Sequence, residues 1–135
     1  MLKKLAVAGI AAATLTLTCL PTVSSAAPDG KAIFAARCSA CHGAAGAGIP
    51  GAFPPLAGNP HVTGPAAVPI KTVVNGAQGA LKVNGKAYNG VMQAWRGAPP
   101  ALMTNAEIAA VLTYVRSSFG NKASAVTEAQ VAAVK

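Results

Sequence analysis

Two cysteines and a histidine lie close together near the start of the chain, and this motif constrains the fold more than any other feature. The stretch reads Arg-Cys-Ser-Ala-Cys-His-Gly over residues 37–43, and its reactive members are Cys38, Cys41 and His42. Three kinds of site use such a motif: a redox-active disulfide, part of a zinc site, or the covalent anchor of a c-type haem. The rest of the sequence distinguishes among them.

The N-terminal segment has the pattern of a secretory signal peptide. Lys3 and Lys4 precede an apolar run over residues 5–20, and small residues follow it. The run is shorter than the about 20 apolar residues that a membrane-spanning helix needs. The small residues predict cleavage after Ala26 or Ala27.

Removal of residues 1–27 as the signal peptide leaves about 108 residues, 28–135, which is the size of a single domain. We expect this mature part to be soluble, exported and periplasmic. Attachment of a lipid at Cys19 is the alternative, although the residues before Cys19 match the signal for lipid attachment poorly. The sequence has no tandem repeat and no second Cys-x-x-Cys-His motif, so one domain with one such site is expected.

The mature part is basic, with nine lysines and arginines against three acidic residues and a formal charge of +6. The basic residues are spread singly, and the chain has only one tryptophan, two tyrosines and three phenylalanines. This pattern does not favour nucleic acid as a partner. We expect the charge to steer an acidic protein partner instead.

The composition of the mature part favours a bound apolar group. Alanine, glycine, valine and proline dominate it, and such small residues bury little apolar surface. Large aromatic side chains normally supply much of the buried area of a small domain. A porphyrin at the centre would supply the missing apolar bulk.

The three kinds of site can now be compared. A thioredoxin-like pair of cysteines needs a βαβ context. After the signal peptide, the sequence has none of the runs rich in valine and isoleucine that predict a parallel sheet. A zinc site needs four ligands, and beyond the motif only His61 and three scattered acidic residues are available. Two thiols at this spacing followed directly by an imidazole are typical of c-type haem attachment. An ordinary structural disulfide between Cys38 and Cys41 is the remaining alternative.

The residues around the motif resemble the class I monohaem cytochromes c, of the bacterial exported type, over nearly the whole mature chain. The stretch GKAIFAARCSACHG resembles the first helix of that family, with Asp29 placed to cap it. The resemblance implies an all-α fold of three to five helices around one haem. It also implies covalent attachment of the haem through Cys38 and Cys41, with His42 as a ligand of the iron.

A second matching block, FPPLAG, covers residues 53–58. In the family, a proline carbonyl in this loop accepts a hydrogen bond from the second ring nitrogen of the haem histidine, which fixes the ring and strengthens its bond to iron. The resemblance assigns this role to Pro54, with Pro55 as the alternative.

A third block, NGKAYNGVMQAW over residues 84–95, resembles the loop that carries the methionine ligand of the family, here Met92. Family members often have proline after this methionine, and Gln93 stands there instead, which removes rigidity from the loop. Met103, His61 or an open sixth position are the alternatives. We expect Met103 to pack at the start of the last long helix and His61 to be a solvated loop residue.

The last long helix has the clearest pattern of the chain. Thr104 and Glu107 have the spacing of a capping box, and Gly120 is placed to end the helix. Apolar residues follow the box at helical spacing: Ile108, Val111, Leu112, Val115 and Phe119.

The resemblance implies that this helix crosses the first one, with Gly30 and Phe34 against Val111 and Tyr114. Two shorter helices are also expected. One covers residues 67–74, and the other, a frayed one near the C-terminus, is capped by Thr127.

The resemblance implies a one-electron carrier without catalytic residues, because histidine and methionine ligands leave no iron position for a substrate. A haem subunit of a membrane dehydrogenase or oxidase complex, and a peroxidase-like protein with an open sixth site, are the alternatives. Trp95 is expected to pack on the haem. We expect redox proteins to dock at the haem edge on small apolar groups and positive charges: Val91, Ala94, Ala98, Pro99, Lys82, Lys86 and Arg96.

Overall fold

The structure, a computed structural model, describes residues 25–97 and 102–135. Most of the predicted leader, including Cys19, lies outside these residues, as do Ala98 and Pro99 of the expected docking surface. The described part is mostly helical and contains six helices and one two-stranded sheet. The helices are α1 (Gly30–Arg37), α2 (Ser39–His42), α3 (Pro60–Thr63), α4 (Ala67–Asn75), α5 (Asn105–Ser117) and α6 (Glu128–Ala133).

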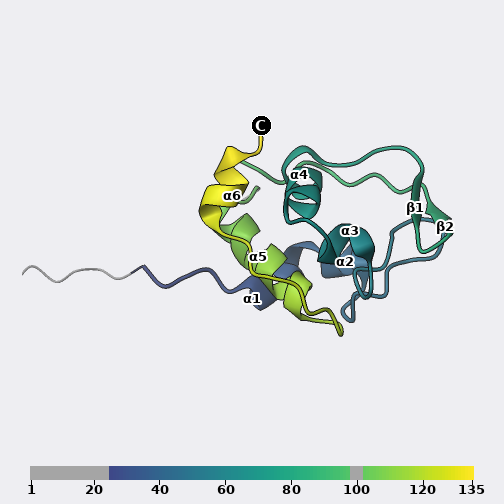
Figure 1. The fold of residues 1–135 in the computed structure, drawn as a ribbon, viewed down its shortest axis with the longest axis horizontal. Coiled ribbons are helices and arrows are strands. Elements are labelled where there is room, and N and C mark those ends of the chain that lie inside the picture. The colour runs from purple at the N-terminus through teal and green to yellow at the C-terminus, as the bar shows by residue number, and fades with distance from the viewer. Residues whose placement is uncertain (1–24, 98–101) are drawn as a thin grey trace, which may run out of the picture.

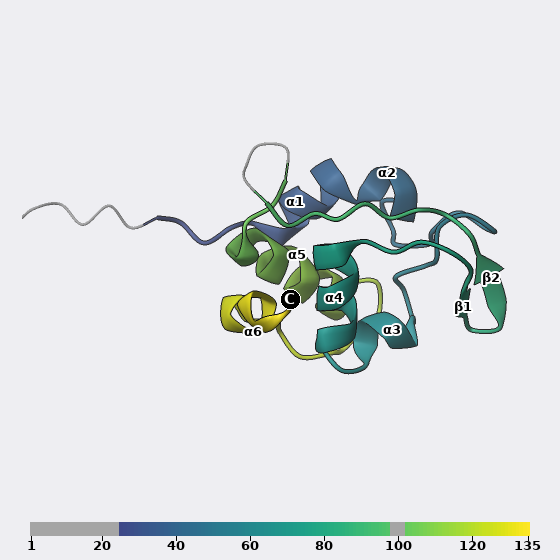
Figure 2. The same ribbon diagram turned by 90° about the horizontal axis from the view of Figure 1, so that it is seen from above.

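Six helices exceed the expected three to five because α2 and α3 are single turns of four residues. The all-α expectation also missed the sheet, a hairpin of β1 (Leu81–Val83) and β2 (Lys86–Tyr88). Its two-residue turn places Asn84 and Gly85 at φ 50° and 80°, the left-handed geometry that matches the twist of paired strands. The hairpin lies at the end of the molecule opposite α6 (Figures 1 and 2).

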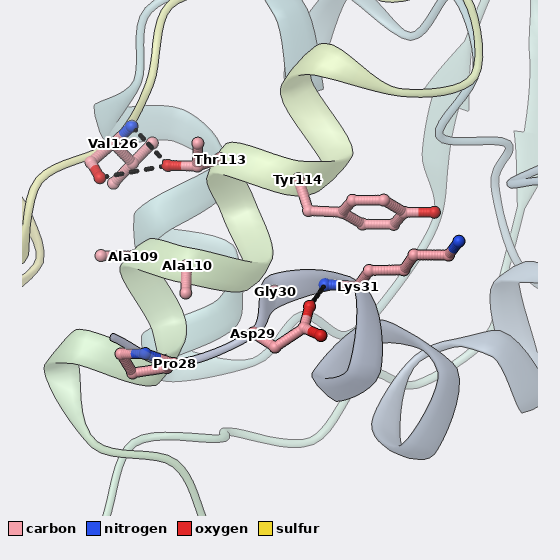
Figure 3. Close-up of a pocket in the computed structure, with 9 residues that line it drawn as sticks. All are labelled: Pro28, Asp29, Gly30, Lys31, Ala109, Ala110, Thr113, Tyr114 and Val126. Carbon is pink, nitrogen blue, oxygen red and sulfur yellow. Dashed lines mark hydrogen bonds between the residues drawn. The ribbon is translucent and has the colours of Figure 1, made fainter. Parts of the chain in front are cut away.

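Helix α1 begins where the sequence predicted. The Asp29 side chain accepts hydrogen bonds from the backbone of Lys31 and Ala32, at 2.9 and 3.2 Å, which confirms the cap. Figure 3 shows the bond from Lys31. These bonds satisfy two of the backbone donors that a helix leaves free at its start. The predicted helix at residues 67–74 is also confirmed, as α4.

The crossing of α1 with α5 is confirmed and depends on Gly30. A β-carbon at Gly30 would lie 2.1 Å from the carbonyl oxygen of Ala110, so only glycine lets the two backbones approach this closely (Figure 3). Phe34 is buried beside the crossing, with its ring centroid 5.6 Å from that of Tyr114. Figure 3 also shows the shallow depression at this crossing, which has a volume of about 350 Å³ and contains none of the predicted site residues.

Helix α5 has the predicted capping box, in which Thr104 and Glu107 bond each other's backbone N–H groups. The helix ends at Ser117, however, and does not include Phe119 as the apolar spacing suggested. Phe119 adopts a left-handed conformation with φ 58°, and its ring packs 5.2 Å from that of Phe34. The chain therefore turns before Gly120, and Phe119 joins the core from outside the helix.

Helix α6 is a packed element rather than a frayed end. Thr127 caps the helix, as predicted, and forms a capping box with Gln130. Val131 in the middle of the helix is 0% exposed and belongs to the same core as residues of α4 and α5. Burial of this apolar face stabilises a helix too short to persist alone in water.

A buried arginine joins α3 to the C-terminal part of the chain. Arg116 is 2% exposed, and its guanidinium donates hydrogen bonds to the carbonyl oxygens of Val62, Gly64 and Ser124. Several bonds of this kind are needed to offset the desolvation of a buried charge. Within residues 25–97 and 102–135, the structure contains no helix long and apolar enough to cross a membrane.

Candidate functional site

A cavity of about 500 Å³ lies among the helices and contains the residues of the sequence motif. Its volume falls within the range of cofactor sites. The walls come from α2, α3, α4, α5 and the segments beside them, and their side chains are mainly apolar. Among the lining residues are Cys38, Cys41, His42, Phe53, Pro54, Leu56, Val62, Val73, Tyr88, Met92, Trp95, Met103, Val111, Leu112 and Val115.

The two cysteines lie in one wall of this cavity. A helical turn joins them, since the backbone N–H groups of Cys41 and His42 both donate to the carbonyl of Cys38. Both cysteines are free thiols, with Cys38 half-buried and Cys41 exposed. Burial, and secondarily the neighbouring Cys41, raises the pKa of Cys38 to about 11. The motif thus presents two thiols to one cavity.

His42 is buried in the same wall and is oriented by the proline loop. Its Nδ1 lies 3.0 Å from the carbonyl oxygen of Pro54. Because a carbonyl only accepts, Nδ1 carries the proton, and Nε2 of the neutral ring keeps a free electron pair. Burial lowers the pKa of His42, although the bond to Pro54 acts in the opposite direction. The ring is therefore oriented by Pro54, and its neutral form is favoured.

The proline loop is itself held by two buried asparagines. Asn59 donates to the carbonyl of Pro55 at 2.8 Å, so this carbonyl is already engaged while that of Pro54 faces His42. Asn121 accepts from the backbone N–H of Gly58 at 2.9 Å and donates to the carbonyl of Leu56 at 3.0 Å. These contacts fix the loop that sets the tilt of the imidazole ring.

Met92 is half-buried and lines the cavity from the loop after the hairpin. Its backbone N–H and carbonyl both pair with Ala77, each at 2.9 Å, and Trp95 N–H donates to the carbonyl of Val73. Gly76, at φ 77°, lets this loop lie against the end of α4, since a β-carbon there would lie 2.5 Å from the Met92 carbonyl oxygen. Backbone pairing thus supplies rigidity that Gln93 does not.

The alternative ligands also line the cavity. Met103 is buried before the cap of α5, in the same core as Ile108, which agrees with packing at the helix start. His61 is exposed as expected, but it lies in α3 rather than in a loop, because Asn59 caps a turn that begins with Pro60.

Trp95 is half-buried and lines the cavity, the place expected for a residue that packs on a haem. The guanidinium carbon of Arg37 lies 5.9 Å from the centre of its ring, within the range of a cation–π contact. This contact joins the start of the cysteine motif to the Met92 loop.

The expected docking surface is present only in part. Val91, 65% exposed, and Ala94 lie in the Met92 loop, and Lys82 and Lys86 are exposed on the hairpin. Arg96 was wrongly assigned to it. Its side chain is half-buried and donates to carbonyl oxygens at the end of α6, so its charge is used inside the fold. The docking surface therefore consists of Val91, Ala94, Lys82 and Lys86.

Sequence reasoning missed the polar residues that hold the cavity walls. Asn59 before Pro60 had a local signal, since asparagine followed by proline is typical of a helix start. Asn121, Arg96 and Arg116 had none, because the carbonyls that they bind lie up to 65 residues away in sequence.

The cavity and its donors fit a covalently bound haem. Two thiols one helical turn apart suit the two vinyl groups of a porphyrin, and a neutral buried imidazole with its second nitrogen already bonded suits the iron. The thioether of Met92, on the same cavity, would supply a soft second ligand. The apolar walls suit the porphyrin faces.

Comparison with known proteins agrees with this fit. A sequence model of the family "Cytochrome c" matches residues 27–119. Cytochrome c-552 of Thermus thermophilus is 41% identical over 99 residues, which are 69% of this chain and 70% of that protein. A protein of Gluconacetobacter polyoxogenes named alcohol dehydrogenase (quinone), cytochrome c subunit, is 31% identical over 116 residues, or 80% of this chain but 22% of that subunit. The chain therefore belongs to the class I monohaem cytochrome c family.

Proposed function

We propose that this protein is a one-electron carrier with a single haem c, bound through Cys38 and Cys41 and held by His42 and Met92 as axial ligands. The observation that carries this proposal is one cavity lined by both thiols, by an oriented imidazole and by a thioether. When bound, the haem would accept and release one electron at its iron. The protein supplies attachment, orientation and an apolar environment.

The residues around the cavity explain why a carrier is favoured over an enzyme. The Met92 loop is fastened by backbone bonds to Ala77 and Val73, which holds a sixth ligand against the cavity. If His42 and Met92 both bound the iron, no iron position would be left for a substrate, which favours a carrier over a peroxidase-like protein. The thioether favours the reduced iron relative to a second nitrogen ligand, and His42, neutral and bonded to Pro54, completes the ligand set.

We propose that the haem exchanges electrons with redox proteins through the docking surface. Exposed Val91 and Ala94 sit beside the cavity, and the exposed lysines Lys82 and Lys86 lie on the neighbouring hairpin. Small apolar groups beside positive charge suit brief contact with an acidic partner, burying less than about 1,200 Å² in total. Nucleic acid is not among the proposed partners, and contact with a membrane would come only through a partner protein or a lipid attached at Cys19.

The proposed location is the periplasm. Residues 1–27 would be removed as a signal peptide, and residues 28–135 would fold as the haem domain. The proposal is supported by the basic, apolar and small-residue pattern of the N-terminus, which is typical of a secretory signal peptide. N-terminal sequencing of protein recovered from the periplasm tests the cleavage at Ala26 or Ala27.

A haem subunit within a larger dehydrogenase is the second candidate. It is favoured by the similarity to the alcohol dehydrogenase subunit, of which this chain matches 22%. A subunit would co-purify with its dehydrogenase from native membranes, whereas a free carrier would be recovered alone from the periplasmic fraction.

The ligand set is tested by absorption spectra of the purified holoprotein. We expect a low-spin c-type spectrum with the weak red band of sulfur bonded to ferric iron. Met92→Ala should abolish this band, while Met103→Leu and His61→Ala should keep it. Survival of the band in Met92→Ala, or its loss in Met103→Leu alone, would contradict the assignment of Met92.

A further inference from the structure

Arg96, four residues after Met92, bonds the C-terminal part of the chain with its side chain. Its Nη1 donates to the carbonyl oxygen of Val134 at 2.6 Å, and its Nη2 donates to the carbonyl oxygen of Val131. Both acceptors lie at the end of α6, where the last carbonyls have few backbone partners and carry partial negative charge. The arginine therefore binds α6 as a cationic C-terminal cap.

Helix α6 is itself firmly placed. Val131 is 0% exposed in the core, and the capping box at Thr127 fixes the other end of the helix. Asn75, at the end of α4, donates to the backbone carbonyl of Lys135 at 3.3 Å. The sequence match to the family covers residues 27–119, so α6 lies beyond it.

We propose that Arg96 and α6 position the loop that carries Met92, so that the C-terminal helix controls how firmly the sixth ligand is held. This inference rests on the proposed function, in which Met92 binds the haem iron. Arg96 follows Trp95, whose backbone N–H bonds Val73, and only three residues separate Arg96 from Met92. A shift at Arg96 is therefore passed to Met92 through a short, hydrogen-bonded segment.

The bonding of Arg96 indicates a positioning role rather than a large role in overall stability. The Val131 carbonyl also accepts from the Val134 N–H and would stay bonded without the arginine. The Nε of Arg96 is buried and has no hydrogen-bond partner among the described residues, so removal of the side chain also removes an unsatisfied donor. Loss of Arg96 should thus release the loop more than it unfolds the protein.

The test uses full-length holoprotein and imidazole, which competes with Met92 for the iron. Arg96→Met should bind imidazole about tenfold more tightly than the native protein, which corresponds to about 1.4 kcal/mol of lost loop anchoring. Arg96→Lys keeps the charge and one donor direction, so its imidazole affinity should lie between those of the native protein and Arg96→Met. Thr127→Ala weakens α6 without touching Arg96 and should raise imidazole affinity about threefold.

Two controls separate positioning from general loosening. Lys71→Met removes one exposed charge from α4 and should leave imidazole affinity within about twofold of native. Phe34→Leu loosens the packing against Tyr114, outside the cavity wall, and should lower the thermal midpoint with the same small effect on imidazole.

The possible outcomes are distinct. If imidazole affinity follows the thermal midpoint in every variant, including Phe34→Leu, then Arg96 is only structural and the inference is overturned. If Arg96→Met and Thr127→Ala match Lys71→Met, it is overturned as well. A native protein without the sulfur–iron band would contradict the proposed ligand Met92, and the inference would fall with that premise rather than through its own variants.

Discussion

Gly76 is the residue at which the structure makes its sharpest quantitative prediction. It ends α4 with φ 77° and ψ −179°, a conformation that side-chain-bearing residues rarely adopt. A β-carbon there would lie 2.5 Å from the carbonyl oxygen of Met92 and 2.9 Å from the backbone nitrogen of Ala94. Both are backbone atoms, so Gly76→Ala must push the Met92 loop away by about 1 Å to reach ordinary contact distance.

The matched control is Gly79→Ala, in the same segment. Gly79 also has positive φ, at 86°, but a β-carbon there meets nothing within 4 Å. Gly79→Ala should introduce only backbone strain, which lowers the unfolding free energy by about 1–2 kcal/mol. Gly76→Ala should have the same kind of strain, and the clash should lower its unfolding free energy by about 1–3 kcal/mol more. The contact with the Met92 loop is present at Gly76 and absent at Gly79, so it contributes to the difference between the two variants.

Thermal unfolding of the holoproteins measures the difference. A loss of 1 kcal/mol corresponds to about 5 °C in a domain of this size, so Gly76→Ala should melt about 10 °C below Gly79→Ala. The sulfur–iron band should weaken in Gly76→Ala and persist in Gly79→Ala. Equal midpoints and equal bands in the two variants would refute the claim that Gly76 holds the ligand loop in place.

Three further predictions concern other parts of the molecule. Burial lowers the pKa of His42 below its ordinary value of 6.5, so the neutral ring is favoured in the folded protein and protonation opposes folding only at acid pH. The low-spin spectrum should therefore persist as the pH falls through 6.5. A spectral transition centred at pH 6.5 would contradict this and would indicate a solvated ring. Arg116→Met leaves buried carbonyls unbonded and should lower the unfolding free energy by about 3 kcal/mol in denaturant titrations; a loss below about 1 kcal/mol would contradict its role. Lys86→Glu should slow oxidation of the haem by ferricyanide several-fold at low salt in stopped-flow measurements. Lys31→Glu, which makes the same charge change on α1, should leave the rate unchanged. Equal rates in the two variants would contradict the role of Lys86 in the docking surface.

Local sequence signals predicted the helices well. Asp29, Thr104 and Thr127 have side chains that bond backbone groups two or three residues away, so their capping roles follow from short-range geometry. The hairpin was equally local, since Asn84-Gly85 between short apolar alternations is a strong turn signal, and the expectation of an all-α fold wrongly set it aside.

The residues that support the walls of the site could not be predicted from local sequence patterns. Asn121 and Arg96 act on backbone carbonyls that only the folded chain brings near them, and isolated basic or amide residues give no signal of such partners. Phe119 shows the converse, because its apolar spacing fitted α5 while its left-handed backbone carries it out of the helix and onto Phe34. Tertiary packing decided these positions.

The central claim is tested most directly by peptide mass analysis of protein produced with a c-type haem maturation system. Trypsin cuts after Arg37 and next after Lys71, so one peptide, residues 38–71, contains both Cys38 and Cys41. We predict that this peptide carries the mass of one haem and that no other peptide does. An unmodified peptide, or one whose two cysteines are joined only to each other, would contradict the account.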